Sequence, residues 1–202
     1  MTRTPVSRLY PKRDVQPAHG DPREEITNYL SPMRAFAISL TRNMAAADDL
    51  VQDTIVKAWT NFDKFALGTN LRAWLFTILR NTFFSNRRKA SREVADPDGI
   101  HAANLFVLPQ HDGKLAFREF LVAFNQLSAE HREVLILIGA NGYSYEEAGN
   151  MMGVATGTAK SRASRARARL CELMGMASPT GNPALTDAAT LAVVLQTGLA
   201  VA

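Results

Sequence analysis

A run of cationic side chains near the end of the chain, GTAKSRASRARARL, carries its strongest chemical signal. At helical spacing the small residues Ala159, Ala163 and Ala166 share one narrow face, and the cations lie outside it. A merely solvated basic face would leave these cations repelling one another, because few acidic residues stand four positions away. Since an arginine guanidinium can bind a phosphate or a guanine edge with two hydrogen bonds, the segment predicts a DNA-binding helix. The candidate contact residues are Thr158, Lys160, Ser161, Arg162, Arg165 and Arg167.

The residues just before this helix predict how it is held. Ser144 and Glu147 form an S-x-x-E capping box, which favours a helix start at this point. Gly153 supplies a left-handed turn that ends this first helix, and Thr156 is the expected cap of the second. Two helices joined by a tight turn, the second rich in cations, are typical of a helix-turn-helix that reads the major groove.

The composition excludes several other functions. The chain has 202 residues, 47% hydrophobic and 21% charged, with a net charge of +4, which is typical of a globular protein with room for one or two small domains. Cys171 is the single cysteine, and the four histidines lack metal-ligand spacing, so neither a metal nor another cofactor is expected. No Ser/His/Asp set or carboxylate pair suggests an enzyme. We expect a cytoplasmic protein, because no signal peptide and no apolar run of about 18 residues is present.

The pattern of apolar residues and turn formers predicts two small all-α domains joined by a flexible linker. The expected parts are a mobile arm at 1–22, a domain at 23–90, a linker at 91–113, a second domain at 114–174 and a tail at 175–202. Before the helix-turn-helix, helices are expected at 26–44, 45–61, 71–89, 114–127 and 128–140. In these helices we assign Leu30, Trp59, Trp74 and Ile138 to core faces. The expected helix caps are Ser128 and either Asn70 or Thr69.

Three strings resemble a known family. DDLVQDTIVKAW, then FDKF with NLRAWLFTILRN, then LSAEHREVLIL through GTAKSRASRARARL, resemble in this order three parts of a bacterial sigma factor of the extracytoplasmic-function group. These parts are the polymerase-binding helix and the −10 region of domain 2, and the −35-reading domain 4. The resemblance covers about residues 24–174. The strings NLRAWLFTILRN and SRxxRARARL are most similar to those of the general-stress-response sigma factors of alphaproteobacteria. A sigma factor is not an enzyme: it gives RNA polymerase its promoter specificity and helps to open the duplex.

The resemblance implies roles for residues of the first domain. Asp49, Gln52 and Asp53 would bind the β′ coiled-coil of core RNA polymerase, where the alternative is an ordinary solvated acidic face. Phe65, Asn70 and Asn81 would hold an extruded base of the non-template strand, although Phe65 could equally fill the core under its loop. Phosphates of that strand would be neutralised by Arg72, Arg80, Arg87 and Arg88, which could otherwise be a solvated helix end.

The resemblance also implies partners and a promoter. Domain 4 would read a GGAAC-like −35 element and meet the β flap of the polymerase, and domain 2 would read a GTT-like −10 element. An anti-sigma factor is expected as regulator, and neither a membrane nor a small-molecule substrate is expected. One rival is a sigma-like decoy that binds the anti-sigma factor without promoter activity. The retained cations and the absence of a receiver domain after residue 174 argue against it. The polymerase-binding strings argue against a second rival, a helix-turn-helix repressor.

Four positions depart from the family pattern, and two of them, Ala159 and Ala163, replace larger aliphatic residues in the second helix of the helix-turn-helix. Ala148 and Gly149 stand where the family usually has a larger aliphatic residue followed by alanine. A glycine inside a helix costs about 0.5–1 kcal/mol relative to alanine, so we expect domain 4 to be marginally stable by itself.

Overall fold

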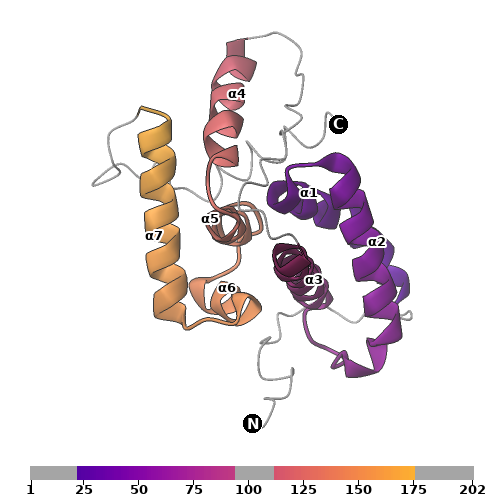
Figure 1. Ribbon diagram of the computed structural model, residues 1–202. Helices are drawn as coiled ribbons and strands as arrows, with labels where there is room; N and C mark the ends of the chain where they lie inside the picture. The colour runs from indigo at the N-terminus through magenta and orange to yellow at the C-terminus, as the bar shows by residue number, and fades with distance from the viewer. Residues whose placement is uncertain (1–21, 94–111, 176–202) are drawn as a thin grey trace. The chain divides into compact units, whose positions relative to one another are not determined.

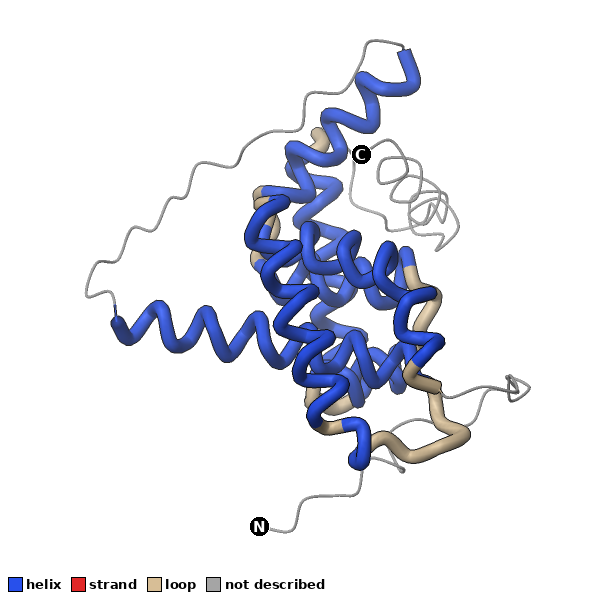
Figure 2. The backbone as a smooth tube through the Cα atoms, turned by 90° about the vertical axis from the view of Figure 1, so that its right-hand side faces the viewer, coloured by secondary structure: helices blue, strands red, loops and turns tan. Residues whose placement is uncertain are grey.

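The computed structural model describes residues 22–93 and 112–175, and these residues form helices and no strands. Figures 1 and 2 show that the regular structure within these two ranges is helical. The chain divides into two compact units, which are treated separately below. The predicted all-α, two-domain class is confirmed. Almost all of the expected arm and tail, and most of the expected linker, lie outside the described residues.

The first unit begins with a helix that is shorter than the sequence predicts. The pattern at 26–44 predicts one helix, but the structure has a 3₁₀ helix, η2 (Glu24–Tyr29), followed by α1 (Leu30–Thr41). Pro32 explains why the α-helix begins only at Leu30. It lacks a backbone N–H and clashes with the preceding turn, so it is tolerated only in the first turn of an α-helix. Leu30, expected in the core, is exposed at this new helix start.

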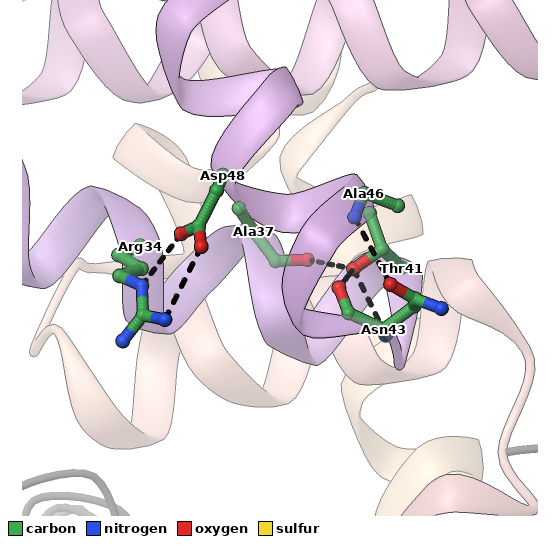
Figure 3. A network of polar contacts seen from close by, with 6 residues as sticks. All are labelled: Arg34, Ala37, Thr41, Asn43, Ala46 and Asp48. Atoms are coloured by element: carbon green, nitrogen blue, oxygen red, sulfur yellow. Dashed lines mark hydrogen bonds and ion pairs between the residues drawn. The ribbon is translucent and has the colours of Figure 1, made fainter. Parts of the chain in front are cut away.

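Helix α1 ends where its backbone reverses. Arg42 adopts a left-handed conformation with φ of 58°, and Asn43 then caps α2 (Met44–Thr60) by accepting a 3.0 Å hydrogen bond from the Ala46 N–H. Thr41 stabilises the turn, because the carbonyl oxygens of Ala37 and Asn43 both lie within hydrogen-bonding distance of its hydroxyl, at 3.0 and 2.9 Å (Figure 3). The α1–α2 corner is therefore fixed by local side-chain hydrogen bonds as well as by packing.

An ion pair joins the same two helices. The Arg34 Nε donates to Asp48 Oδ1 at 2.6 Å, and its second nitrogen reaches Asp48 Oδ2 at 3.3 Å (Figure 3). The hydrogen bond from Arg34 lowers the pKa of the Asp48 carboxyl, and the same bond raises the pKa of Arg34. Because both side chains are partly exposed, the pair fixes geometry more than it adds stability.

The core of the first unit lies between α1, α2 and α3 (Leu71–Glu93). Phe36 of α1 stacks on Phe76 of α3 with ring centroids 5.0 Å apart. The other fully buried side chains of this core include Met33, Leu40, Thr54, Leu75 and Leu79. Each large apolar side chain buried in this way contributes roughly 1.5–3 kcal/mol to folding. The predicted cap of α3 is present, since Asn70 Oδ1 accepts from the Ala73 N–H at 3.0 Å.

The second unit contains α4 (Asp112–Asn125), α5 (Ala129–Leu135), a π-helical turn η4 (Ile136–Ala140), most of α6 (Tyr145–Met152) and α7 (Thr156–Leu173). Ser128 caps α5 as expected, because its hydroxyl accepts from the His131 N–H at 3.3 Å. The π turn was not predicted. Its wider turn shifts the phase of the side chains, so Leu137 is buried while Ile138, expected in the core, is half-buried.

Candidate nucleic-acid and polymerase interfaces

The helix-turn-helix is held by reciprocal hydrogen bonds at its start. The Ser144 N–H donates to Glu147 Oε2 at 2.8 Å, and the Glu147 N–H donates to Ser144 Oγ at 3.1 Å. This is the predicted capping box. Gly153 has the predicted left-handed conformation, with φ of 68°. Thr156 is the first residue of α7 and not its cap: Ala155 holds the cap position, with no side-chain hydrogen bond.

The unusual glycine of α6 has a structural reason. A Cβ built on Gly149 would lie 3.0 Å from the backbone oxygen of Val154 and 3.5 Å from Thr156. The Val154 N–H donates to the Gly149 carbonyl at 2.9 Å, so the turn folds back directly over this residue. The glycine therefore lets the turn approach α6 closely, which offsets part of its unfavourable helix propensity.

Helix α7 has one buried face and one cationic face, as the sequence predicts. Ala159, Ala163 and Ala166 are completely buried. Of the candidate DNA contacts, Thr158, Lys160, Ser161 and Arg165 are exposed, whereas Arg162 and Arg167 are half-buried. Small buried side chains allow α7 to pack closely on its unit while it presents its long cationic side chains outward.

Two side chains from neighbouring helices approach α7, and sequence reasoning assigned neither to the site. The Tyr145 hydroxyl of α6 accepts a 3.0 Å hydrogen bond from Arg167, and Lys160 Nζ lies 5.9 Å from the centroid of the same ring. His131 of α5 lies near Arg165 and Arg162. Burial, and then the charge of these two arginines, lowers the pKa of the imidazole below 6.5, although Glu130 acts in the opposite direction.

Helix α3 carries a row of alternating arginine and phenylalanine. The Arg72 guanidinium lies 5.4 Å from the centroid of Phe76, and that of Arg80 lies 4.8 Å from Phe84. Arg80 also donates to the side-chain oxygen of Asn81 at 3.1 Å. Arg72 and Arg80 are half-buried, and Asn81, Arg87 and Arg88 are exposed. Stacking on a ring holds a guanidinium in one orientation without neutralising it.

Phe65 is placed in the core of the first unit. Its ring is 7% exposed, and it packs 5.5 Å from Phe62 and 5.2 Å from Trp74, measured between ring centroids. Of the two interpretations of Phe65, this position matches the core interpretation. A nucleic-acid base could stack on Phe65 only after the loop had rearranged. Asn70, next to this loop, is half-buried and uses its side chain as the α3 cap.

The exposed face of α2 is half acidic and half apolar. Asp49, Gln52 and Asp53 are exposed on one side of the helix, as predicted. Val56 and Trp59 continue this face at helical spacing, with exposed fractions of 65% and 54%. The prediction that Trp59 faces the core is wrong. It stands eight residues after the buried Val51, and at 3.6 residues per turn the row rotates by about 80° over that distance.

The described residues contain neither a candidate metal site nor a candidate membrane-spanning helix. In the two described ranges no group of three or more His, Cys, Asp and Glu side chains could hold a metal ion. No described helix is both long enough and apolar enough to cross a bilayer.

Comparison with known proteins identifies the family. Residues 26–93 match the family model of Sigma-70 region 2, and residues 117–170 match that of Sigma-70, region 4. The chain is 50% identical over 152 residues to the ECF RNA polymerase sigma factor EcfG of Rhodopseudomonas palustris, covering 75% of this chain and 84% of that protein. It is 30% identical over 146 residues to the RNA polymerase sigma factor CarQ of Myxococcus xanthus, covering 71% and 83%.

A solved structure agrees with these matches. The sigma factor RpoE of Bartonella quintana, crystallised in complex with the anti-sigma factor NepR, is 52% identical, with a TM-score of 0.66 and coverage of 76% of this chain and 96% of that chain. The chain belongs to the extracytoplasmic-function RNA polymerase sigma factors.

Proposed function

We propose that this chain binds core RNA polymerase and directs initiation at promoters with a GGAAC-like −35 element and a GTT-like −10 element, as part of a general stress response. One observation carries the proposal more than any other: α7 presents exposed cations outward while its alanine face is completely buried. This is the arrangement that a recognition helix needs in order to enter a major groove. Arg162 and Arg165 are the candidates for contact with a base or an adjacent phosphate, and Arg167 and Arg169 for contact with the DNA backbone or the polymerase.

The face of α2 supports polymerase binding. Asp49, Gln52 and Asp53 offer charges and hydrogen-bond acceptors, and the adjacent Trp59 offers a large apolar surface. Interfaces take most of their affinity from a few anchors of this kind, and tryptophan is enriched among them. We propose that the β′ coiled-coil covers Trp59 and Val56 together with the acidic residues, and that the β flap meets domain 4.

The Arg/Phe row of α3 supports contact with the separated −10 strand. Arg72 and Arg80, held on their rings, and Arg87 and Arg88 near the end of the helix supply positive charge along one element. We propose that these arginines bind phosphates, and that Asn81 and the loop before Asn70 provide the pocket for an extruded base. Phe65 has no direct role as a stacking platform unless that loop opens.

An anti-sigma factor is the proposed regulator. The Bartonella relative is in complex with one, and this chain is 52% identical to it over almost the full length of that chain. An anti-sigma factor that binds the present chain is expected to suppress transcription when it reaches a one-to-one ratio with it.

Transcription with purified components tests the proposal. The chain is added to sigma-free core polymerase on a template that carries the GGAAC/GTT promoter, and the run-off product is measured. A discrete transcript that disappears when either element is mutated is the expected result. Core binding without a transcript from this promoter would reject the proposed sequence elements. Loss of both core binding and transcript would contradict polymerase binding and favour the decoy.

A further inference from the structure

Tyr145 lies between two cations of α7 and contacts both. Its hydroxyl accepts from Arg167 at 3.0 Å, and its ring lies 5.9 Å from Lys160 Nζ. The two cations are seven residues apart, which is two helical turns, so they fall on the same side of α7. This side differs from the one that carries Arg162 and Arg165. One aromatic side chain of α6 therefore organises one of the two cationic rows of α7.

Tyr145 is itself fixed in place. It is the first residue of α6, directly after the capping-box residue Ser144, whose reciprocal bonds with Glu147 define the start of the helix. The tight turn at Gly149 and Gly153 then sets the distance between α6 and α7. The position of the Tyr145 ring relative to α7 is thus determined by backbone geometry, and not only by its contact with the cations.

Most of the hydrogen-bonding capacity of Arg167 is left for an outside acceptor. In residues 112–175 the Tyr145 hydroxyl is its one hydrogen-bond partner, and no carboxylate pairs with it. Its Nε is buried and makes no hydrogen bond there, so the donors open to an outside acceptor are those of the terminal guanidinium nitrogens. A guanidinium carries five N–H donors, so a neutral hydroxyl positions the group and leaves its charge intact. Arg169, by contrast, is paired with Glu172 at 2.7 Å.

We propose that Tyr145 is a positioning residue that holds Lys160 and Arg167 as a clamp for a backbone phosphate of duplex DNA. The proposal rests on the proposed DNA-reading role of α7, and it assigns this row of α7 to the backbone, leaving Arg162 and Arg165 for the bases. Preorganised cations lose less side-chain freedom on binding, so the clamp raises affinity for any duplex without changing sequence preference.

Two double-mutant cycles on the assembled holoenzyme test the proposal. Affinity for a labelled promoter duplex is measured for the unaltered chain, Tyr145→Phe, Arg167→Gln and the double variant, over a range of salt concentrations. The second cycle replaces Arg167→Gln by Arg162→Gln as a matched control on the same helix. Tyr145→Phe keeps the ring and removes only the hydroxyl, and thermal unfolding checks that each variant folds.

The expected result is a roughly 3- to 10-fold weaker affinity for Tyr145→Phe, equal for matched and mutated −35 sequences, which corresponds to about 0.7–1.4 kcal/mol. Adding Tyr145→Phe to Arg167→Gln should cause little further loss, whereas adding it to Arg162→Gln should multiply the two losses. Arg167→Gln should lower the salt slope of the affinity by about one.

Three results would overturn the inference: unchanged affinity for Tyr145→Phe, multiplicative losses in both cycles, or a change in sequence preference. A merely structural role of the tyrosine would affect both cycles alike. If the unaltered holoenzyme does not distinguish matched from mutated −35 duplexes, the proposed promoter-reading role of α7 fails first, and that result is distinct from a failed cycle.

Discussion

Helices α2 and α7 present two kinds of binding surface. The outward face of α7 is cationic, with hydroxyls and small residues between the cations, whereas the outward face of α2 combines two carboxylates with an exposed valine and tryptophan. A cationic surface gains affinity by releasing counterions from a polyanion, so its binding weakens steeply with salt. An exposed apolar side chain contributes to affinity because binding buries its surface away from water, and this contribution changes little with salt concentration. The contrast predicts that promoter and polymerase affinities respond differently to the same change in ionic strength.

Removal of the base-facing cations of α7 should give the largest effect. Arg162→Gln and Arg165→Gln are each expected to cost about 1–3 kcal/mol of promoter affinity and to relax specificity at one position of the −35 element. Holoenzyme binding to a set of duplexes with single base changes measures both quantities. An equal loss on every duplex would move the residue concerned from base reading to phosphate contact.

Removal of the exposed tryptophan of α2 should give the second-largest effect. Trp59→Ala is expected to weaken core polymerase binding by about 2 kcal/mol or more, and this loss should be nearly the same at low and high salt. Asp53→Arg is the matched change of charge, and its effect should shrink as salt increases. Titration of labelled core polymerase with each variant gives the affinities. A Trp59→Ala variant that binds core normally would remove Trp59 from the proposed interface.

Overpacking of the buried face of α7 should reduce stability. Ala163 is completely buried, so Ala163→Leu forces its neighbours apart and is expected to cost about 1–3 kcal/mol of unfolding free energy. Ala168→Leu, on the exposed side of the same helix, is the control and should cost little. Urea unfolding followed by circular dichroism compares the two variants. Similar stabilities would contradict the close packing of α7.

The smallest effect should come from the titration of His131. Its pKa in the folded chain lies below the ordinary value of 6.5, first because of burial and then because of Arg165 and Arg162. Folding therefore disfavours the protonated form. The stability that depends on the neutral form is complete above pH about 6.5 and is lost as the pH falls through the lowered pKa.

A titration by nuclear magnetic resonance tests this assignment. The His131 pKa should rise in Arg165→Gln, because one of the nearby positive charges is removed, but burial should keep it from returning fully to 6.5. His131→Gln should also flatten the dependence of unfolding free energy on pH below about pH 6.5. An imidazole that titrates identically with and without Arg165 would place that cation away from it.

The sequence predicts those features that depend on local chemistry. The capping box at Ser144, the left-handed Gly153, the caps at Asn70 and Ser128 and the buried alanine face of α7 each depend on residues close in sequence. A local pattern of this kind needs no information about tertiary packing, which is why the helix-turn-helix could be predicted almost completely.

The sequence does not predict features that depend on the rotational position of a side chain around its helix or on contacts between helices. The apolar row Val51, Ile55 and Trp59 predicts a core position for Trp59, but the slow rotation of that row brings Trp59 to the surface. The π turn at Ile136–Ala140 leaves no clear sequence signal. Tyr145 and His131 reach α7 across helix boundaries, so only the packed unit shows them beside its cations.

The most direct test of the account measures two affinities on two variants. Core polymerase affinity and the promoter affinity of the assembled holoenzyme are determined for Trp59→Ala and for the double variant Arg162→Gln/Arg165→Gln. The account predicts that Trp59→Ala weakens only core binding and that the double arginine variant weakens only promoter binding. Loss of both affinities in either folded variant would contradict the assignment of separate surfaces on α2 and α7.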